Sequence, residues 1–337
     1  MTDGTGFASD SLSNVRLGSH LGVLPDDLLS RLPSWPEPST MPLILDSDIG
    51  SEPDDALALA VAAGLPSLSL VIASNEHDGQ RARFARHLLD LMGRTDVPVV
   101  SGIDLGNRSA WAAEGIVPEY VSAQPTDVAG AVLQVLHRYD SQIGWVGLGP
   151  LSNLAALLTT DHDACAQLCV TQQEAALRVD LEGPGQNIAL DLPAARTVLS
   201  AGLLPWVVPT ELTLNVLNQI TEGTTEYKVI AHSDDPAHIL LRTHINQWFD
   251  EEVPSFSLNG LSTLALAVGM PFVTALPADI ALNEAGRIQS GDNAAYMATS
   301  IDYSNFRKWL VDRLERITSV SHHHPAADYD PHTRRGE

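Results

Sequence analysis

Residues 43–55 most constrain the fold, because they lead from a short apolar run through an acid-rich turn into an alanine- and leucine-rich stretch. Residues 42–45 are apolar, few and followed by turn residues, which predicts a buried strand. The strand should end with Asp46 and Asp48, whose side chains then point to the same side, because side chains alternate along a strand. A turn and a helix should follow within residues 49–63. The segment therefore predicts the strand, turn and helix order of an α/β sheet.

The same segment carries a dense group of carboxylates. Five acidic side chains fall within the ten positions 46–55, namely Asp46, Asp48, Glu52, Asp54 and Asp55. Asp54 and Asp55 lie at the expected helix start, where negative charge is favoured and helix amides can hold a carboxylate. Carboxylates that converge at the end of a strand repel one another unless a hard cation such as Ca²⁺ or Mg²⁺ neutralises them. Helix capping would explain Asp54 or Asp55 alone, so the whole group favours a cation site.

The rest of the chain continues the alternation of strand and helix patterns. Strands are expected at residues 69–74, 97–101, 143–148 and 206–208, and helices at 80–92 and 129–139. This alternation predicts an α/β fold, a single domain with an open, mostly parallel, Rossmann-like sheet flanked by helices. We expect residues 41–318 to form this domain, residues 1–40 an N-terminal extension, and residues 319–337 a disordered tail.

Charge and composition exclude several classes of partner. The net charge of −23 argues against nucleic acid and anionic membranes, because phosphate binding needs clustered Lys and Arg. No apolar run reaches the length of a membrane span, and the N-terminus lacks the pattern of a secretory signal. The two cysteines, Cys165 and Cys169, give no disulfide framework. We therefore expect a cytoplasmic protein with a small-molecule ligand.

Several segments resemble one known family. Residues 45–59 are similar to the N-terminal signature of the inosine-uridine-preferring nucleoside hydrolases, with a turn that is two residues longer. Further matches follow in the family's order, at residues 96–102, 147–155, 186–195, 276–280 and 300–306. The resemblance covers about residues 41–318 and implies an open, largely parallel α/β sheet. The implied reaction is hydrolysis of the N-glycosidic bond of a ribonucleoside.

The resemblance also implies roles for individual residues. In family members a Ca²⁺ ion, held by aspartates and a backbone carbonyl, binds the ribose 2′- and 3′-hydroxyls and a water molecule. By position, Asp48 would be a metal ligand and the catalytic base, Asp55 a second ligand, and Leu148 the carbonyl ligand. Asp54 would accept a ribose hydroxyl, and Asn187 would bind ribose. The chemistry is consistent, because a metal lowers the pKa of water and anionic surroundings stabilise a developing cation.

Other positions depart from the family pattern. The family's late His-Asp pair, whose Asp completes the calcium shell, corresponds here to Leu261 and Ser262. Gly185 stands where the family has a Glu, and the stretch 177–186 is shorter and lacks the family's Met-Gly-Gly. The calcium site therefore lacks one ligand of the family pattern. This should weaken calcium binding, because hard-cation affinity depends on the number and charge of the ligands.

Two acidic residues could replace that ligand. Glu52 is the extra acid of the longer turn, and Asp78 follows the second strand of the family pattern. The alternative for both is a solvated loop position, because charged loop residues are mostly exposed. Asp78 and the neighbouring His77 are also candidates for substrate binding, because strand ends rim the crevice of an open sheet.

Residues 244–259 bring aromatic and titratable side chains to a region that lies over the substrate in the family. Trp248 is a candidate for stacking on a nucleobase, with core packing as the alternative. His244 is a candidate replacement for the missing acid, because a pKa near neutrality suits that role.

The predicted function is metal-assisted attack of water on the anomeric carbon of a ribonucleoside or a related N-riboside. The alternative is a non-hydrolytic descendant that binds a ribosyl-containing ligand or catalyses other chemistry in a specialised biosynthetic pathway. Dependence on a divalent metal discriminates between the two. The resemblance further implies a homo-oligomer, because family members commonly form dimers or tetramers.

Overall fold

A mixed sheet of nine strands organises the computed structural model, which describes residues 41–107, 111–176, 185–251 and 253–319. The expected N-terminal extension, the short stretch 177–184 and all of the expected tail except Ser319 lie outside the described residues. The strand order is β10-β9-β11-β6-β5-β4-β1-β2-β3. The strands are β1 Leu43–Ser47, β2 Leu68–Ala73, β3 Val99–Ser101, β4 Ile143–Gly147, β5 Leu168–Ala175, β6 Trp206–Pro209, β9 Val273–Leu282, β10 Ile288–Ser290 and β11 Asn293–Ile301.

The sheet is parallel over most of its width. Strands β1 to β6 pair in parallel, and β11 joins β6 in parallel. Strands β9 and β10, which form the edge beyond β11, pair antiparallel. A separate pair of short antiparallel strands, β7 Gln219–Ile220 and β8 Phe256–Ser257, lies outside this sheet. The predicted α/β class and mostly parallel sheet are confirmed.

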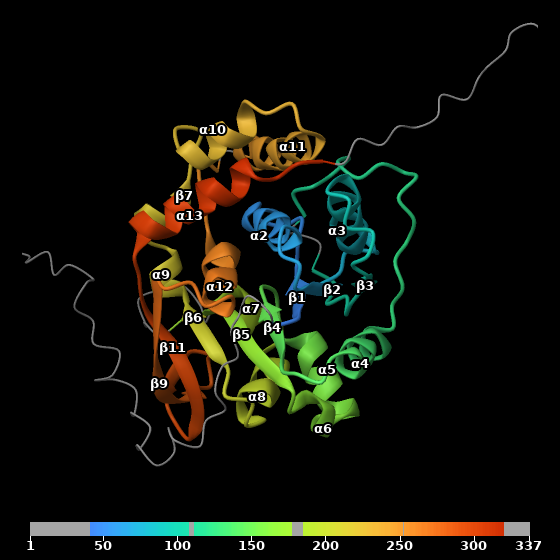
Figure 1. Cartoon of the computed structure of the whole chain (residues 1–337). Helices are drawn as coiled ribbons and strands as arrows, with labels where there is room; N and C mark the ends of the chain where they lie inside the picture. Colours follow the sequence, from blue (N-terminus) through green and yellow to red (C-terminus); the bar gives the residue numbers. More distant parts are fainter. Residues whose placement is uncertain (1–40, 108–110, 177–184, 252, 320–337) are drawn as a thin grey trace, which may run out of the picture.

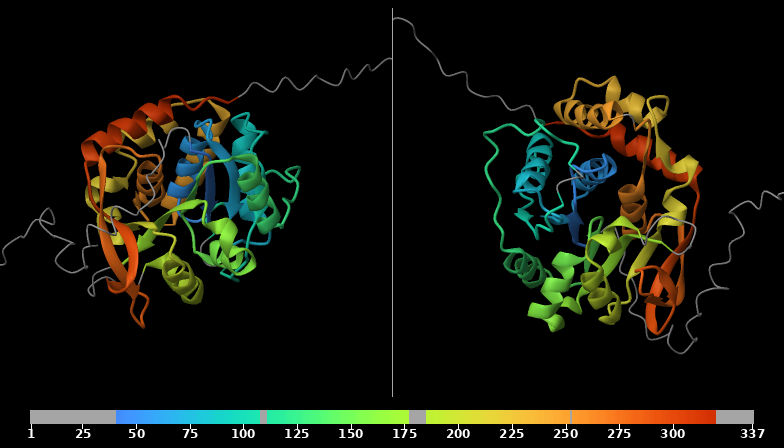
Figure 2. Two further views of the ribbon diagram at one scale, coloured as in Figure 1. Left: turned by 60° about the horizontal axis from the view of Figure 1, so that its bottom comes forward. Right: turned by 180° about the vertical axis from the view of Figure 1, so that it is seen from behind.

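Helices cover both faces of the sheet (Figures 1 and 2). One face packs against α2 Asp54–Ala63, α3 Gln80–Leu91, α10 Thr225–Ala231, α11 Pro236–Asp250, α12 Asn259–Ala267 and α13 Tyr303–Glu315. The other packs against α4 Val128–Arg138, α5 Ser152–Thr160, α6 His162–Cys165, α7 Gln186–Leu190 and α8 Leu192–Ser200. The short helix α9 Thr210–Thr213 and a 3₁₀ turn, Val216–Asn218, follow β6. None of the described helices is long and apolar enough to cross a membrane.

The order of the strands reverses between β1 and β4. From β1 the chain runs to β2 and β3 on one side, and then returns to place β4 and β5 on the other. In open α/β sheets such a reversal leaves a crevice at the carboxyl ends of the two strands, where ligands bind. Asp48 follows the end of β1, and Leu148 follows the end of β4. The topology therefore brings two of the predicted site residues to one place.

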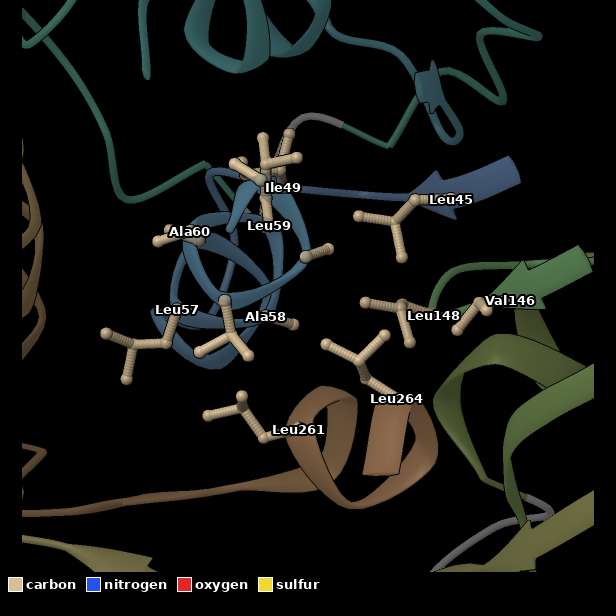
Figure 3. Packing of buried hydrophobic residues seen from close by; sticks show 14 of the residues in the cluster. Leu45, Ile49, Leu57, Ala58, Leu59, Ala60, Val146, Leu148, Leu261 and Leu264 are labelled. Atoms are coloured by element: carbon tan, nitrogen blue, oxygen red, sulfur yellow. The ribbon is translucent and has the colours of Figure 1, made fainter. Parts of the chain in front are cut away.

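Helix α2 packs beside α12 and α3. All ten of its residues are buried, which explains why its sequence is apolar on every side after the two leading aspartates. Leu261 and Leu264 of α12 point toward α2, near Leu57 and Ala58 (Figure 3). Burial of one leucine side chain contributes about 1.5–3 kcal/mol. The contact therefore fixes the start of α2 against the start of α12.

Candidate active site

Four buried carboxylates gather where β1 meets α2. Asp46 lies in β1, Asp48 follows it in the turn, and Asp54 and Asp55 are the first two residues of α2. None of the four is more than 7% exposed. The sequence predicted this convergence, and the structure brings the four side chains together.

Asp48 and Asp55 are neighbours within the cluster. The Asp55 carboxyl accepts a hydrogen bond from Ser47 Oγ at 2.7 Å and lies within hydrogen-bonding reach of the Asp48 carboxyl. Burial raises the pKa of Asp55 well above its usual value, and the nearby charge of Asp48 raises it further. Two carboxylates at this separation are stable only with a proton or a cation between them.

Asp54 is held by the start of α12. Its Oδ2 accepts a hydrogen bond from the Gly260 amide at 2.8 Å. Burial raises the pKa of Asp54 well above its usual value, and the charges of Asp55 and Glu52 add to the effect. Glu52 is itself fixed, because its Oε1 accepts a hydrogen bond from the Ser257 amide at 2.9 Å. Glu52 therefore belongs to the cluster, although it comes from the longer turn.

Asp46 has a different environment from Asp48. Asn153 of α5 donates from Nδ2 to Asp46 Oδ1 at 3.0 Å, and burial raises the pKa of Asp46 to about 7. Strand β1 ends at Ser47, so Asp48 already lies in the turn and the alternation of strand side chains does not extend to it. The two aspartates that the sequence placed on one strand face thus have partners on different elements.

Leu148 and Asn187 lie on the β4 side of the point where the strand order reverses. The Leu148 amide donates to the Asp46 carbonyl at 2.7 Å, which ties the ends of β1 and β4 together. The Leu148 carbonyl accepts a hydrogen bond from Asn187 Nδ2 at 2.6 Å. A side chain at position 260 would approach both Asp55 and Leu148, because a Cβ added to Gly260 would lie 2.9 Å from Asp55 Oδ1 and 3.2 Å from Leu148 Cδ1. Leu148 and Asn187 are therefore neighbours of the acidic cluster.

Arg81 lies beneath the acidic turn, and the sequence reasoning missed it. Its side chain is wholly buried and donates from Nη1 to the carbonyls of Asp48 and Ile49 and to Ser51 Oγ. Burial lowers the pKa of Arg81, and the charge of Asp48 acts in the opposite direction. The available signal was a basic residue near the start of the helix after the second strand, in a chain with 19 basic and 42 acidic residues.

The described residues do not complete the calcium site that the resemblance implies. Outside the gaps at 108–110, 177–184 and 252, no three His, Cys, Asp or Glu side chains of residues 41–319 are grouped as a metal would need. Ser262, at the position of the family's aspartate, donates from Oγ to the Leu258 carbonyl at 2.7 Å and lies 3.3 Å from Asn218 Oδ1. Leu261, at the position of the family's histidine, packs in the apolar core (Figure 3). The donor set therefore does not fit a calcium cage.

The remaining candidates lie around this cluster in different settings. Asp78 is exposed and has a left-handed backbone (φ 52°) in the turn before α3. His77 stacks on Trp111, with their ring centroids 5.1 Å apart. Trp248 of α11 is half-buried, donates to the Ser255 carbonyl at 3.2 Å and packs against the apolar core.

His244 is unsuited to the role of a replacement acid. Its side chain is wholly buried on α11, and Nε2 lies 3.1 Å from the Ser51 carbonyl. Burial lowers the pKa of His244 to about 4. The imidazole is therefore neutral at pH 7 and holds no proton that it could give up as an acid at that pH. Its contact with Ser51 instead ties α11 to the acidic turn.

Comparison with known proteins identifies relatives of this chain. The family model described as inosine-uridine preferring nucleoside hydrolase matches residues 43–308. A pyrimidine-specific ribonucleoside hydrolase RihA from Enterobacter sp. (strain 638) is 26% identical over 182 residues, which are 48% of this chain and 58% of the relative. The RihA of Photobacterium profundum is 29% identical over 143 residues, 38% of this chain and 46% of the relative. The chain spans about half the length of the curated relatives it matches.

Solved structures share the fold at low sequence identity. A plant nucleoside hydrolase, PpNRh1, superposes with a TM-score of 0.70 at 20% identity, over 82% of this chain and 99% of its own. The purine-preferring ribonucleoside hydrolase of Gardnerella vaginalis gives 0.69 at 20% identity, over 81% and 98%. The type III effector XopQ, solved with adenosine diphosphate ribose, gives 0.64 at 19% identity, over 86% and 96%.

Proposed function

Because the chain belongs to the inosine-uridine preferring nucleoside hydrolase family, whose model matches residues 43–308, we propose that it hydrolyses the N-glycosidic bond of a ribonucleoside or a related N-riboside. One observation carries the proposal. Asp48, Asp54 and Asp55 lie close together after the end of β1, and Asn187 donates to the Leu148 carbonyl after the end of β4. Ordinary helix capping gives no reason for this arrangement.

Each residue has a defined role in the proposed reaction. Asp48 takes a proton from a water molecule, whose oxygen attacks the anomeric carbon while the bond to the nucleobase nitrogen breaks. The base leaves with the electron pair of that bond and takes up a proton from solvent. Asp54 accepts a hydrogen bond from a ribose hydroxyl, and Asn187 binds the ribose from the β4 side. Asp78 and Trp248 are proposed to contact the rest of the ligand.

The charge of the cluster favours the transition state of this reaction. Cleavage of an N-glycosidic bond places positive charge on the ribose ring as it becomes oxocarbenium-like. Carboxylates at the developing charge stabilise it more than they stabilise the neutral substrate, and burial strengthens the effect. Asp48 is 7% exposed, so water screens its charge little.

Calcium assistance remains an implication of the resemblance. Asp48, Asp55 and the Leu148 carbonyl would be the ligands that the family pattern assigns. In the structure the Leu148 carbonyl already accepts the Asn187 amide, and Ser262 is bonded within its own helix. The proposed reaction therefore uses the side chains of Asp48, Asp54 and Asn187.

A second candidate function is binding of a ribosyl-containing ligand without hydrolysis, or other chemistry on such a ligand. The observation that favours it is the environment of Leu261 and Ser262. Both side chains are wholly buried: Leu261 packs in the apolar core, and Ser262 donates to the Leu258 carbonyl. Neither is therefore placed to protonate a leaving base. Under this candidate function, Asp54 and Asn187 would still bind ribose, but the protein would not hydrolyse the ligand.

The decisive experiment is a chromatographic screen of a nucleoside panel for free base and free ribose. The full chain is incubated with purine and pyrimidine ribonucleosides, in EDTA and in calcium, beside an Asp48→Asn variant. Release of equal amounts of base and ribose by the wild type, lost in Asp48→Asn, supports hydrolysis. Ligand-induced stabilisation without any product supports the second candidate.

Location and assembly remain predictions. We propose a cytoplasmic homo-oligomer, and two features support it. Cys165 and Cys169 are both free and buried, as in proteins of a reducing compartment. The neighbouring side chains of Leu214, Val216 and Leu217 are 49%, 74% and 58% exposed, which suits contact with a second copy of the chain. Light scattering of the full chain measures the oligomeric state.

A further inference from the structure

The Arg81 guanidinium gathers oxygen atoms from the acidic turn. Its Nη1 donates to the Asp48 carbonyl, to the Ile49 carbonyl at 2.9 Å and to Ser51 Oγ at 2.8 Å. Its Nε donates to the Asn75 carbonyl at 2.7 Å, which fixes the side chain against the end of β2. The whole residue is 0% exposed. One buried cation thus holds three oxygens of the turn that carries Asp48.

Glu76 is a second carboxylate whose charge attracts Arg81, after Asp48. Glu76 accepts hydrogen bonds from the amides of His77, Arg81 and Ala82 and from Ser101 Oγ, at 2.8–3.2 Å. The charge of Glu76 is therefore stabilised by the amino end of α3 and by β3. The guanidinium itself is directed at the turn, where Asp48 contributes the largest of its electrostatic attractions.

We propose that the Arg81 guanidinium takes the place of a divalent cation in organising the acidic turn, so that the site assembles without metal. A divalent ion in such a cluster would draw oxygen atoms together and offset carboxylate charge. Arg81 does both, because it is permanently charged and presents several donors in a fixed geometry. The carboxylate missing at position 262 fits this arrangement, because a single guanidinium charge offsets fewer acids than a divalent ion.

The turn is also clamped from its other sides. Gly50 has a left-handed backbone (φ 93°), and Trp111 lies so close that a Cβ at this position would be 2.3 Å from the indole. The Ala112 amide donates to the Gly50 carbonyl at 2.8 Å, and His244 reaches the Ser51 carbonyl. These contacts hold the backbone of the turn on the sides that Arg81 does not reach.

The proposed role of Arg81 in assembling the site is the same for both candidate functions. Its test therefore measures cation binding and stability, not turnover. The full wild-type chain is melted in EDTA and in millimolar calcium, and calcium binding is measured by titration calorimetry. We expect equal melting temperatures and no measurable binding heat. A wild-type chain that calcium stabilises by several degrees would overturn the proposal.

Three variants separate this role from general structural support. Arg81→Gln removes the charge and should create a measurable response to calcium, both in binding heat and in melting temperature, where the wild type shows none. Arg81→Lys keeps the charge and should lower the melting temperature while remaining indifferent to calcium. Arg94→Gln is the matched control, because Arg94 also binds three main-chain carbonyls, those of Ala63, Leu65 and Leu68.

The calcium responses of Arg81→Gln and Arg94→Gln decide between a cation-replacing role and an ordinary structural role of Arg81. The proposal is supported if calcium partly restores the stability of Arg81→Gln but not that of Arg94→Gln. It is overturned if both variants lose stability and neither responds to calcium, because Arg81 would then be an ordinary structural arginine. If Arg81→Gln does not fold, the wild-type titration decides alone.

Discussion

Asn187 Nδ2 lies 2.6 Å from the carbonyl oxygen of Leu148, which joins α7 to the end of β4 at the border of the acidic cluster. The resemblance assigned these two residues separately, the carbonyl to a metal and the amide to ribose. In the structure each is the other's partner, so a ligand that engages Nδ2 of Asn187 has to compete with this bond.

Asn187→Ala should weaken both stability and substrate binding. The buried Leu148 carbonyl would lose a hydrogen-bond donor, which costs about 1–3 kcal/mol in the free energy of unfolding. We expect a lower melting temperature and a raised KM for any nucleoside that turns over. Asn246→Ala, on the exposed surface of α11, is the control and should change neither by much. An unchanged KM in Asn187→Ala would remove this residue from the binding site.

Asp48→Asn should abolish turnover while the fold survives. Removing a general base lowers kcat by about 10²- to 10⁴-fold. Asparagine has nearly the same shape and relieves the repulsion between Asp48 and Asp55, so the melting temperature should not fall. Asp127→Asn serves as the control, because Asp127 caps α4 at a solvent-exposed position and asparagine caps equally well. Retention of kcat in Asp48→Asn would exclude Asp48 as the base.

The stability of the protein should depend on His244 in mildly acidic solution. Burial lowers the pKa of His244 from 6.5 to about 4. Between these values the unfolded chain binds a proton that the folded chain does not, so stability rises with pH over this window and is lost on acidification. Integration over the shift gives about 3 kcal/mol as an upper estimate.

His244→Gln tests this pH dependence. Denaturant titrations from pH 4 to pH 7 should show a smaller slope of stability against pH than the wild type shows. His137→Gln, at the exposed carboxyl end of α4, should retain the wild-type slope. Parallel curves for wild type and His244→Gln would mean that other groups carry the acid sensitivity.

Leu261→Ala should behave as a core mutation. Leu261 is 0% exposed and points toward α2 (Figure 3), so its truncation should cost about 2–5 kcal/mol in the free energy of unfolding. Leu276→Ala, at a side chain that is 51% exposed, should cost much less. Urea unfolding of both variants makes the comparison. A Leu261→Ala variant of normal stability but altered substrate preference would instead place the side chain in the binding site.

Sequence reasoning succeeded where the signal was local. The apolar run before Asp46, the turn and the helix from Asp54 are patterns within a few neighbouring residues, and they located β1, α2 and the carboxylates between them. The strand and helix alternation located the parallel sheet in the same way. The last residue of β1 was harder to predict from the sequence, because the pairing of Asp46 and Ser47 with residues of β2 and β4 determines where the strand ends.

Long-range contacts to the main chain were out of reach for the same reason. Arg81 binds carbonyls 32 and 33 residues earlier in the chain, and every residue has a carbonyl, so no residue type marks the partner. No sequence pattern predicts the hydrogen bond between Asn187 and the Leu148 carbonyl either. The environment of His244 depends on how α11 packs over the turn, which only the folded chain defines.

Restoring the family's carboxylate with Ser262→Asp should destabilise the protein without creating a calcium site. Ser262 is wholly buried, and its Oγ faces two acceptors, the Leu258 carbonyl and Asn218 Oδ1. An ionised carboxylate cannot donate a hydrogen bond, so at position 262 it would face these two acceptor oxygens without a donor. A buried unpaired charge costs several kcal/mol. Melting in EDTA and in calcium measures both effects, with Ser257→Asp as a second buried serine for comparison. Recovery of wild-type stability by Ser262→Asp in calcium alone would show that the site still holds the geometry of an ion cage, and that only one ligand separates it from the family pattern.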